Sequence, residues 1–295
     1  MALLLFFAFL AGLPADERLK QCLEQKDRAC VARILATPPA TDSVEELVLA
    51  ARGYMFLQRN VEAAAAIDRA LQIEPGDYAL LMERGWICQR SGDQPSAIHS
   101  FLLAAKAKPA SPEVFYELGM SFFFAREFAR ASKHFEHALA LDPANDRAAF
   151  MLGVVSIWSE QIEQAEPYFS QAVNLQPDNP HYLLHYGVLL AKEGRNERAL
   201  ELMLRSEKLD PRNPLTHFNI GRVLKSQGKL TDARAELETA VKQRPDFSAA
   251  LYQLAGVYRQ LGDQARARRT LEHFQTASAA EKNAEQDPID AALSQ

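Results

Sequence analysis

Small and large apolar residues recur along this chain with a period of 34 residues. One column holds only alanine, namely Ala63, Ala97, Ala131, Ala165, Ala199, Ala233 and Ala267. Twelve positions earlier lies a column of tiny residues, namely Ala51, Gly85, Gly119, Gly153, Gly187, Gly221 and Ala255. A larger apolar residue follows each alanine by four positions, namely Ile67, Phe101, Phe135, Phe169, Met203, Leu237 and Leu271. Because residues four apart share a helix face, the pattern predicts two closely packed helices per repeat.

Prolines, glycines and polar caps mark the ends of these predicted helices. A proline column closes the second helix, namely Pro75, Pro109, Pro143, Pro177, Pro211 and Pro245. In three repeats a capping side chain before a proline opens the first helix, at Ser111-Pro112, Asn179-Pro180 and Asn213-Pro214. Glycines mark the turn between the two helices, at Gly92, Gly194, Gly228 and Gly262. The sequence therefore predicts an all-α chain of consecutive helix–turn–helix hairpins.

This pattern of tiny residue, alanine, large apolar residue and proline resembles the tetratricopeptide repeat (TPR) and covers about residues 44 to 275. The resemblance implies a right-handed α-solenoid of stacked hairpins whose first helices line a concave groove. Seven repeats are predicted, at residues 44–77, 78–111, 112–145, 146–179, 180–213, 214–247 and 248–275. The last one departs from the pattern, because Phe274 replaces a small residue and no proline closes it.

The two ends of the chain differ from the repeats. Residues 1–15 contain an uncharged apolar run from Ala2 to Leu13, which is too short to span a bilayer but fits a signal peptide cleaved after Ala15. Residues 16–43 are predicted to form a degenerate capping hairpin and linker, and residues 276–295 a polar tail. Cys22 and Cys30 flank the turn of this capping hairpin, so in an exported chain they are disulfide candidates.

In each first helix, the positions three before, one after and four after the tiny residue lie on one face. The resemblance implies that this face lines the groove. The predicted apolar floor of this groove consists of Met82, Trp86, Tyr116, Met120, Phe123, Phe150 and Val154. Basic residues are predicted to form its margins, Arg52 at one end and Arg222, Lys225 and Arg259 at the other. The alternative interpretation is that these side chains pack as ordinary core between neighbouring repeats.

Composition narrows the class of function. With 48% hydrophobic and 24% charged residues the chain is globular, and a net charge of −5 gives no reason to expect nucleic-acid binding. We find no phosphate-binding loop, paired-cysteine zinc motif or catalytic signature, so no enzyme activity and no cofactor are predicted. His181 and His185, four apart on one predicted helix, leave metal binding as a remote alternative.

The function predicted from these features is a non-enzymatic scaffold or adaptor. It would bind a protein or peptide segment in the concave apolar groove, with no stable membrane span. The apolar N-terminal run favours an exported protein, periplasmic or secreted. The alternative is a cytoplasmic TPR adaptor in which the same residues form a packed N-terminal helix.

Overall fold

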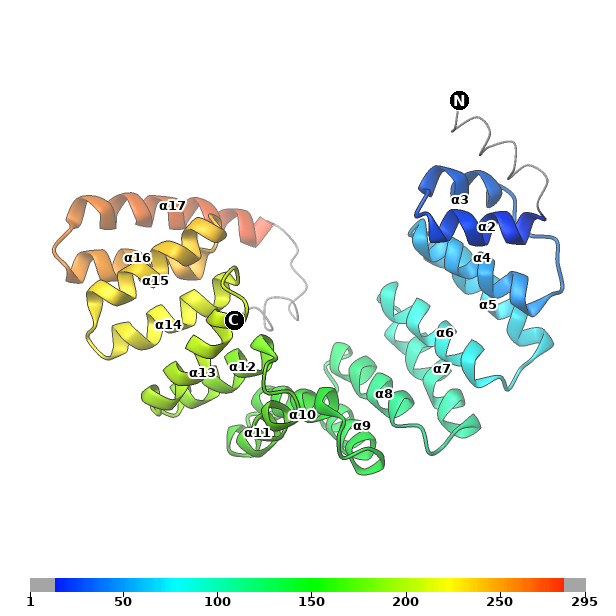
Figure 1. Cartoon of the computed structure of the whole chain (residues 1–295), viewed down its shortest axis with the longest axis horizontal. Helices are drawn as coiled ribbons and strands as arrows, with labels where there is room; N and C mark the ends of the chain where they lie inside the picture. Colours follow the sequence, from blue (N-terminus) through cyan, green and yellow to red (C-terminus); the bar gives the residue numbers. More distant parts are fainter. Residues whose placement is uncertain (1–13, 284–295) are drawn as a thin grey trace. The chain divides into compact units, whose positions relative to one another are not determined.

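The computed structural model describes residues 14–283, so the predicted signal peptide lies outside the described residues except for its last two. Within this range the chain forms sixteen α-helices and one short 3-10 helix, and no strand (Figure 1). The chain consists of two compact units, with the boundary after Pro143. The all-α fold of stacked hairpins is confirmed within each unit, because consecutive helices pack in pairs.

Unit 1 contains four hairpins. Its helices are α2 (Ala15–Glu24), α3 (Arg28–Ile34), α4 (Val44–Phe56), α5 (Asn60–Ile73), α6 (Tyr78–Arg90), α7 (Gln94–Ala107), α8 (Pro112–Phe124) and α9 (Phe128–Leu141). The short pair α2 and α3 forms the N-terminal hairpin, and α2 also packs against α4. Cys22 and Cys30 are joined by a disulfide across this hairpin, with Cα atoms 5.9 Å apart.

Unit 2 also contains four hairpins. Its helices are α10 (Asp146–Trp158), the 3-10 helix η1 (Ile162–Gln164), α11 (Ala165–Leu175), α12 (Pro180–Lys192), α13 (Asn196–Leu209), α14 (Pro214–Ser226), α15 (Leu230–Gln243), α16 (Ser248–Gln260) and α17 (Gln264–Asn283). Helix α11 is shorter than its counterparts. Pro167 explains this, since a proline is tolerated only in the first turn of an α-helix.

The last helix runs further than the sequence predicted. Helix α17 continues to Asn283, past residue 275, so residues 276–283 of the predicted polar tail are helical. Ala277 is buried, and the Glu281 carboxylate accepts a hydrogen bond from the Ser248 hydroxyl of α16. These contacts attach the extra turns of α17 to the preceding helix.

Three helix starts were predicted from a polar residue before a proline, and two of the three polar side chains cap as expected. The Asn179 side chain accepts hydrogen bonds from the backbone N–H groups of His181 and Tyr182, and Asn213 accepts one from Leu215. The Ser111 side chain makes no capping bond. Its hydroxyl lies 2.9 Å from the Tyr78 hydroxyl instead, which competes with the cap.

The turn inside each repeat hairpin uses one left-handed residue. The predicted glycines Gly92, Gly194, Gly228 and Gly262 have φ values between 74° and 82°. Gln58, Arg126 and Glu160 occupy the equivalent positions in the other hairpins, with φ values of 64°, 60° and 59°. The turn geometry is therefore kept even where no glycine is present, at a conformational cost.

The core is built where the tiny column meets the large apolar column. A Cβ atom placed on Gly119 would lie 2.6 Å from the buried Phe135 ring, and one on Gly153 would lie 2.8 Å from the Phe169 ring. The rings of Phe101, Phe135 and Phe169 are fully buried. Close approach of the two helices in each hairpin therefore depends on the absence of a side chain at these glycines.

We predict that Gly119→Ala lowers the free energy of unfolding by about 1–3 kcal/mol relative to Gly256→Ala. Both glycines lie inside helices, so the gain in helix propensity is the same, but a Cβ on Gly256 meets only the flexible end of Lys225. Urea unfolding of the two variants measures the difference. Equal stabilities would show that the Gly119 and Phe135 contact does not limit helix packing.

Candidate functional site

The predicted groove residues separate into a buried set and an accessible set. The buried set comprises Met82, Tyr116, Phe123, Phe150 and Val154. Helix α6 packs on the second helices α5 and α7, and α8 packs on α7 and α9, so Met82, Tyr116 and Phe123 face neighbouring helices. On α10, the Phe150 ring also packs on Tyr182 of α12, with ring centroids 4.7 Å apart. The Tyr116 ring lies 5.6 Å from the Phe135 ring, and the Phe150 ring 5.6 Å from the Phe169 ring. For these five residues the prediction of a ligand-facing floor is corrected: they belong to the core.

In unit 1 the accessible part of the predicted surface consists of Arg52, Trp86 and Met120. Trp86 on α6 and Met120 on α8 are partly exposed. The Arg52 guanidinium, on α4, makes a 3.0 Å ion pair with Glu83, and its side chain is 61% exposed. Because the Glu83 carboxylate neutralises the Arg52 charge, Arg52 adds less positive charge to the surface than the sequence predicted.

In unit 2 the same face is hollowed by two adjoining cavities. The smaller, of about 120 Å³, is lined by Val188, Ala191, Lys192, Asn196, Asn219, Arg222, Val223 and Ser226. The larger, of about 310 Å³, is lined by Lys225, Tyr252, Ala255, Gly256, Arg259, Gln264, Ala267, Arg268 and Leu271. We call the larger one the basic cavity. Helix α14 contributes Arg222 to one and Lys225 to the other, so the two lie on one surface.

The charges around these cavities have one sign. Neither lining includes a carboxylate, and in the described chain Lys225 and Arg259 make no ion pair. The Lys225 ammonium donates a 2.8 Å hydrogen bond to the neutral Gln253 side chain. Burial, and then repulsion from Arg259, lower the pKa of Lys225 below its ordinary value. A negative group in the cavity would relieve this repulsion.

The basic cavity also has apolar walls. Tyr252 is 57% exposed and Leu271 is 41% exposed. Leu271 occupies the column that holds a buried ring or aliphatic side chain in the preceding repeats. It is accessible because, among the described residues, no further hairpin packs on α17. The cavity therefore combines cationic groups with apolar surface.

His181 and His185 do not form a three-ligand metal site in the described part of the chain. Their rings lie 4.3 Å apart and pack against Phe150, and no third His, Cys, Asp or Glu joins them. Burial, and then the neighbouring His181, lower the pKa of His185 to about 3. Its buried Nε2 atom has no hydrogen-bond partner. The two rings stack at the edge of the core of unit 2, where His181 is exposed and His185 is half-buried.

The structure brings together one titratable cluster that the sequence reasoning missed. Glu207, His217 and Glu236 come from three successive helices, α13, α14 and α15. Their chain separations follow no metal-binding motif, which is why a search for motifs does not find them. Comparison of the repeats could have found two of them, because His217 and Glu207 occupy positions that hold apolar residues in the preceding repeats.

Comparison with protein families agrees with the geometry. Models described as tetratricopeptide repeat match residues 48–112, 125–184, 159–214 and 218–282, which is more than half of the chain. The chain belongs to the tetratricopeptide repeat family. A comparison with curated proteins finds no match.

Solved TPR structures are similar in fold. YrrB, described as a TPR protein with an unusual peptide-binding site, has 23% identity and a TM-score of 0.54, covering 64% of this chain and 97% of its own. A TPR protein from Parabacteroides merdae has 17% identity and a TM-score of 0.65, covering 86% and 98%. The pilF protein of Pseudomonas aeruginosa has 18% identity and a TM-score of 0.61, covering 70% and 94%. At these identities the likeness concerns the fold alone.

No helix within residues 14–283 of this TPR chain combines the length and apolar character that a membrane span requires.

We predict that the free energy of unfolding falls as pH is lowered from about 6.5 towards 3, in part because of His185. An unfolded histidine binds a proton near pH 6.5, whereas folded His185 stays neutral down to about pH 3. This group should contribute a slope of about 1.4 kcal/mol per pH unit inside that window. Urea unfolding at several pH values measures it.

The matched variants are His185→Gln, which should flatten the slope, and His99→Gln, which removes an exposed histidine and should not. An unchanged slope in His185→Gln would contradict the lowered pKa of this ring.

Proposed function

We propose that this chain is an exported protein-interaction scaffold that binds an acidic segment of a partner protein at the basic cavity of unit 2. Proteins of the TPR fold generally mediate protein–protein interaction, which sets the class of function. The observation that carries the finer proposal is the basic cavity itself. It is a preformed hollow between the first helices α14 and α16 and the second helix α17, and it includes Lys225 and Arg259 of the predicted groove columns.

The chemistry of the cavity favours an acidic ligand with an apolar side chain. Lys225, Arg259 and Arg268 supply positive charge, and only Arg268 has a carboxylate partner, Glu272. Tyr252 and Leu271 supply apolar surface. A volume of about 310 Å³ is at the lower end of the range for ligand pockets, and it suits one or two side chains of a peptide.

The adjoining smaller cavity extends this surface along α14. Arg222 is exposed there, and its guanidinium lies 5.4 Å from the centre of the Phe218 ring, a cation–π contact that orients it. An extended peptide seated on Arg259 and Lys225 could continue to Arg222. YrrB, which is similar in fold, is described as having an unusual peptide-binding site, and this supports a peptide as the ligand class.

Trp86 and Met120 in unit 1 are a second candidate surface for the same function. They are the partly exposed members of the predicted apolar floor, and large apolar groups often anchor protein interfaces. The two cavities described above lie in unit 2, so we place the principal contact there. Their contribution is an outcome of the binding test below.

Export is the second part of the proposal. The apolar run from Ala2 to Leu13 fits a signal peptide, and the Cys22–Cys30 disulfide is typical of an oxidising compartment. The alternative, a cytoplasmic adaptor, requires the apolar run to remain attached and the two cysteines to be reduced.

We predict that a random peptide library selected on the purified full chain is enriched in sequences with Asp or Glu near an aromatic or aliphatic residue. Arg259→Glu should weaken binding of a selected peptide by about tenfold or more, since it places a like charge against the ligand. Fluorescence anisotropy of the labelled peptide measures the affinity.

The matched control is Arg212→Glu, which makes the same charge change at an exposed site of unit 2 outside both cavity linings. Selection of basic or purely apolar peptides would contradict the proposal. Loss of binding in Trp86→Ala but not in Arg259→Glu, with both variants folded, would move the contact to unit 1.

We predict that the protein isolated from its native host begins at or near Asp16. Intact-mass measurement under non-reducing and reducing conditions reads both the N-terminus and the disulfide. A cytoplasmic product that keeps residues 1–15 and two free thiols would overturn export and leave the peptide-binding proposal standing.

A further inference from the structure

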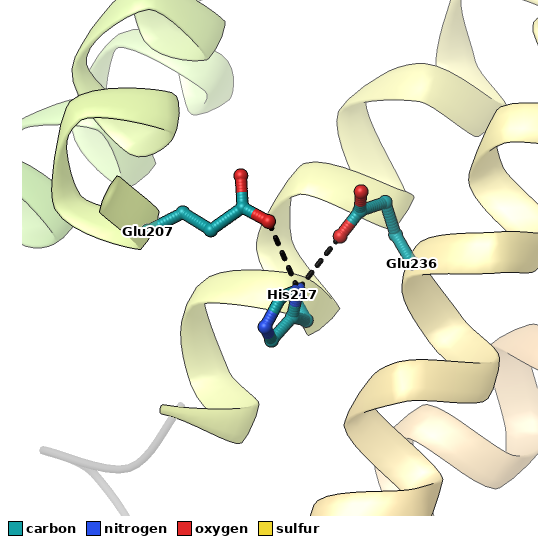
Figure 2. A group of neighbouring side chains, drawn as sticks. All are labelled: Glu207, His217 and Glu236. Carbon is teal, nitrogen blue, oxygen red and sulfur yellow. Dashed lines mark hydrogen bonds and ion pairs between the residues drawn. The ribbon is translucent and has the colours of Figure 1, made fainter. Parts of the chain in front are cut away.

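Three helices of unit 2 direct one side chain each to a common point. Glu207 lies near the end of α13, His217 on the first turn of α14, and Glu236 in the middle of α15 (Figure 2). One nitrogen of His217 and one oxygen of each glutamate all lie within 4.8 Å of one another. The cluster therefore joins two consecutive hairpins, α12 with α13 and α14 with α15.

The two ring nitrogens of His217 have different surroundings. The Nε2 atom lies 3.1 Å from the backbone carbonyl oxygen of Pro211. A carbonyl oxygen only accepts, so Nε2 carries the hydrogen and donates it. The Nδ1 atom faces the glutamates, 2.8 Å from Glu236 Oε2 and 3.6 Å from Glu207 Oε1, and with no cation present it donates its hydrogen to Glu236. A bound cation would take the place of that proton. Histidines that bind metals usually have this arrangement, with the non-ligating N–H given to a carbonyl or carboxylate.

The distances suit an ion with little rearrangement. Zinc binds histidine nitrogen and carboxylate oxygen at about 2.0–2.2 Å, so tetrahedral ligand atoms lie roughly 3.3–3.6 Å apart. The 3.6 Å separation of His217 and Glu207 lies at the upper end of that range, and Glu236, at 2.8 Å, would move outward by about half an ångström to join an ion. The Glu207 and Glu236 side chains are 29% and 24% exposed, whereas that of His217 is 7% exposed. A cation can therefore enter from solvent between the carboxylates and meet a fixed imidazole.

Comparison between repeats shows that two of these residues depart from apolar columns. The positions equivalent to His217 hold Leu47, Leu81, Phe115, Ala149, Leu183 and Leu251. The positions equivalent to Glu207 hold Leu71, Ala105, Leu139, Val173 and Val241 in the repeats that another described hairpin follows, and Gln275 in the last repeat. Helix packing alone is satisfied by apolar residues at both positions, so packing does not explain why this one repeat junction is polar.

We propose that Glu207, His217 and Glu236 bind one divalent transition-metal ion, of the zinc type, which links α13, α14 and α15. Imidazole nitrogen with carboxylate oxygen is a donor set that zinc accepts, and three protein ligands leave a further position for water. The site lies outside both cavity linings, so it is independent of the proposed peptide binding. Its effect is on the junction of two hairpins, which in repeat proteins transmits stability along the array.

The test uses the untagged full chain, freed of metal with a chelator and titrated with zinc chloride in a calorimeter. We expect one zinc ion per chain, and a rise in Tm of roughly 5 °C at about a hundredfold excess of free zinc over Kd. Glu207→Gln and His217→Gln should each weaken zinc binding by more than about tenfold. Glu207 is partly exposed, so its variant keeps the fold even if the buried His217 variant does not.

Two histidine variants serve as controls. His99→Gln removes an exposed histidine of unit 1 and should leave both zinc affinity and the Tm rise unchanged. His181→Gln tests the stacked histidine pair, and loss of binding there would put the ion at His181 and His185 and overturn the proposal. Absence of zinc binding, or full binding in Glu207→Gln, would also overturn it and leave a buried hydrogen-bonded ion cluster.

Discussion

The packing of a bare glycine backbone against a large side chain underlies five hairpins of this protein, those of Gly85, Gly119, Gly153, Gly187 and Gly221. In unit 1, Gly85 receives the Phe101 ring and Gly119 the Phe135 ring; in unit 2, Gly153 receives the Phe169 ring. These contacts set the separation of the two helices, and that separation determines which other positions face inward. The first-helix face, with its cavities and exposed cations, is what remains accessible once those contacts are satisfied.

The sequence predicted the hairpins because the same pattern of small and large apolar residues recurs in each repeat. A single helix would leave its boundaries and its buried face uncertain, and the agreement between repeats determines both. The sequence predicted the site less well. Met82 and Phe123 lie at groove columns like Trp86, yet they are buried, because α6 and α8 each contact second helices on both sides. Helical spacing gives the face of a residue but not the depth at which the next hairpin covers it.

The basic cavity is a second feature whose depth could not be predicted from helical spacing. Its cations Lys225 and Arg259 were visible as the charged end of the predicted groove, but the hollow beside them follows from Gly256 and from the uncovered Leu271. The cluster around His217 could not be read from spacing along the chain, since its members lie on three helices. It becomes visible when equivalent positions of the repeats are compared, because His217 then stands in a column of apolar residues.

The left-handed turn residues make the hairpins unequal in the order in which they assemble. Within unit 2, the hairpins that turn through Gly194, Gly228 and Gly262 reach that backbone conformation without steric penalty, whereas the α10–α11 hairpin turns through Glu160 and continues into a 3-10 segment. In a repeat array, folding can start at any unit and spread to its neighbours. We therefore expect the α10–α11 hairpin to form later and open more readily than the hairpins of α12–α17, because its turn carries a conformational cost that theirs do not.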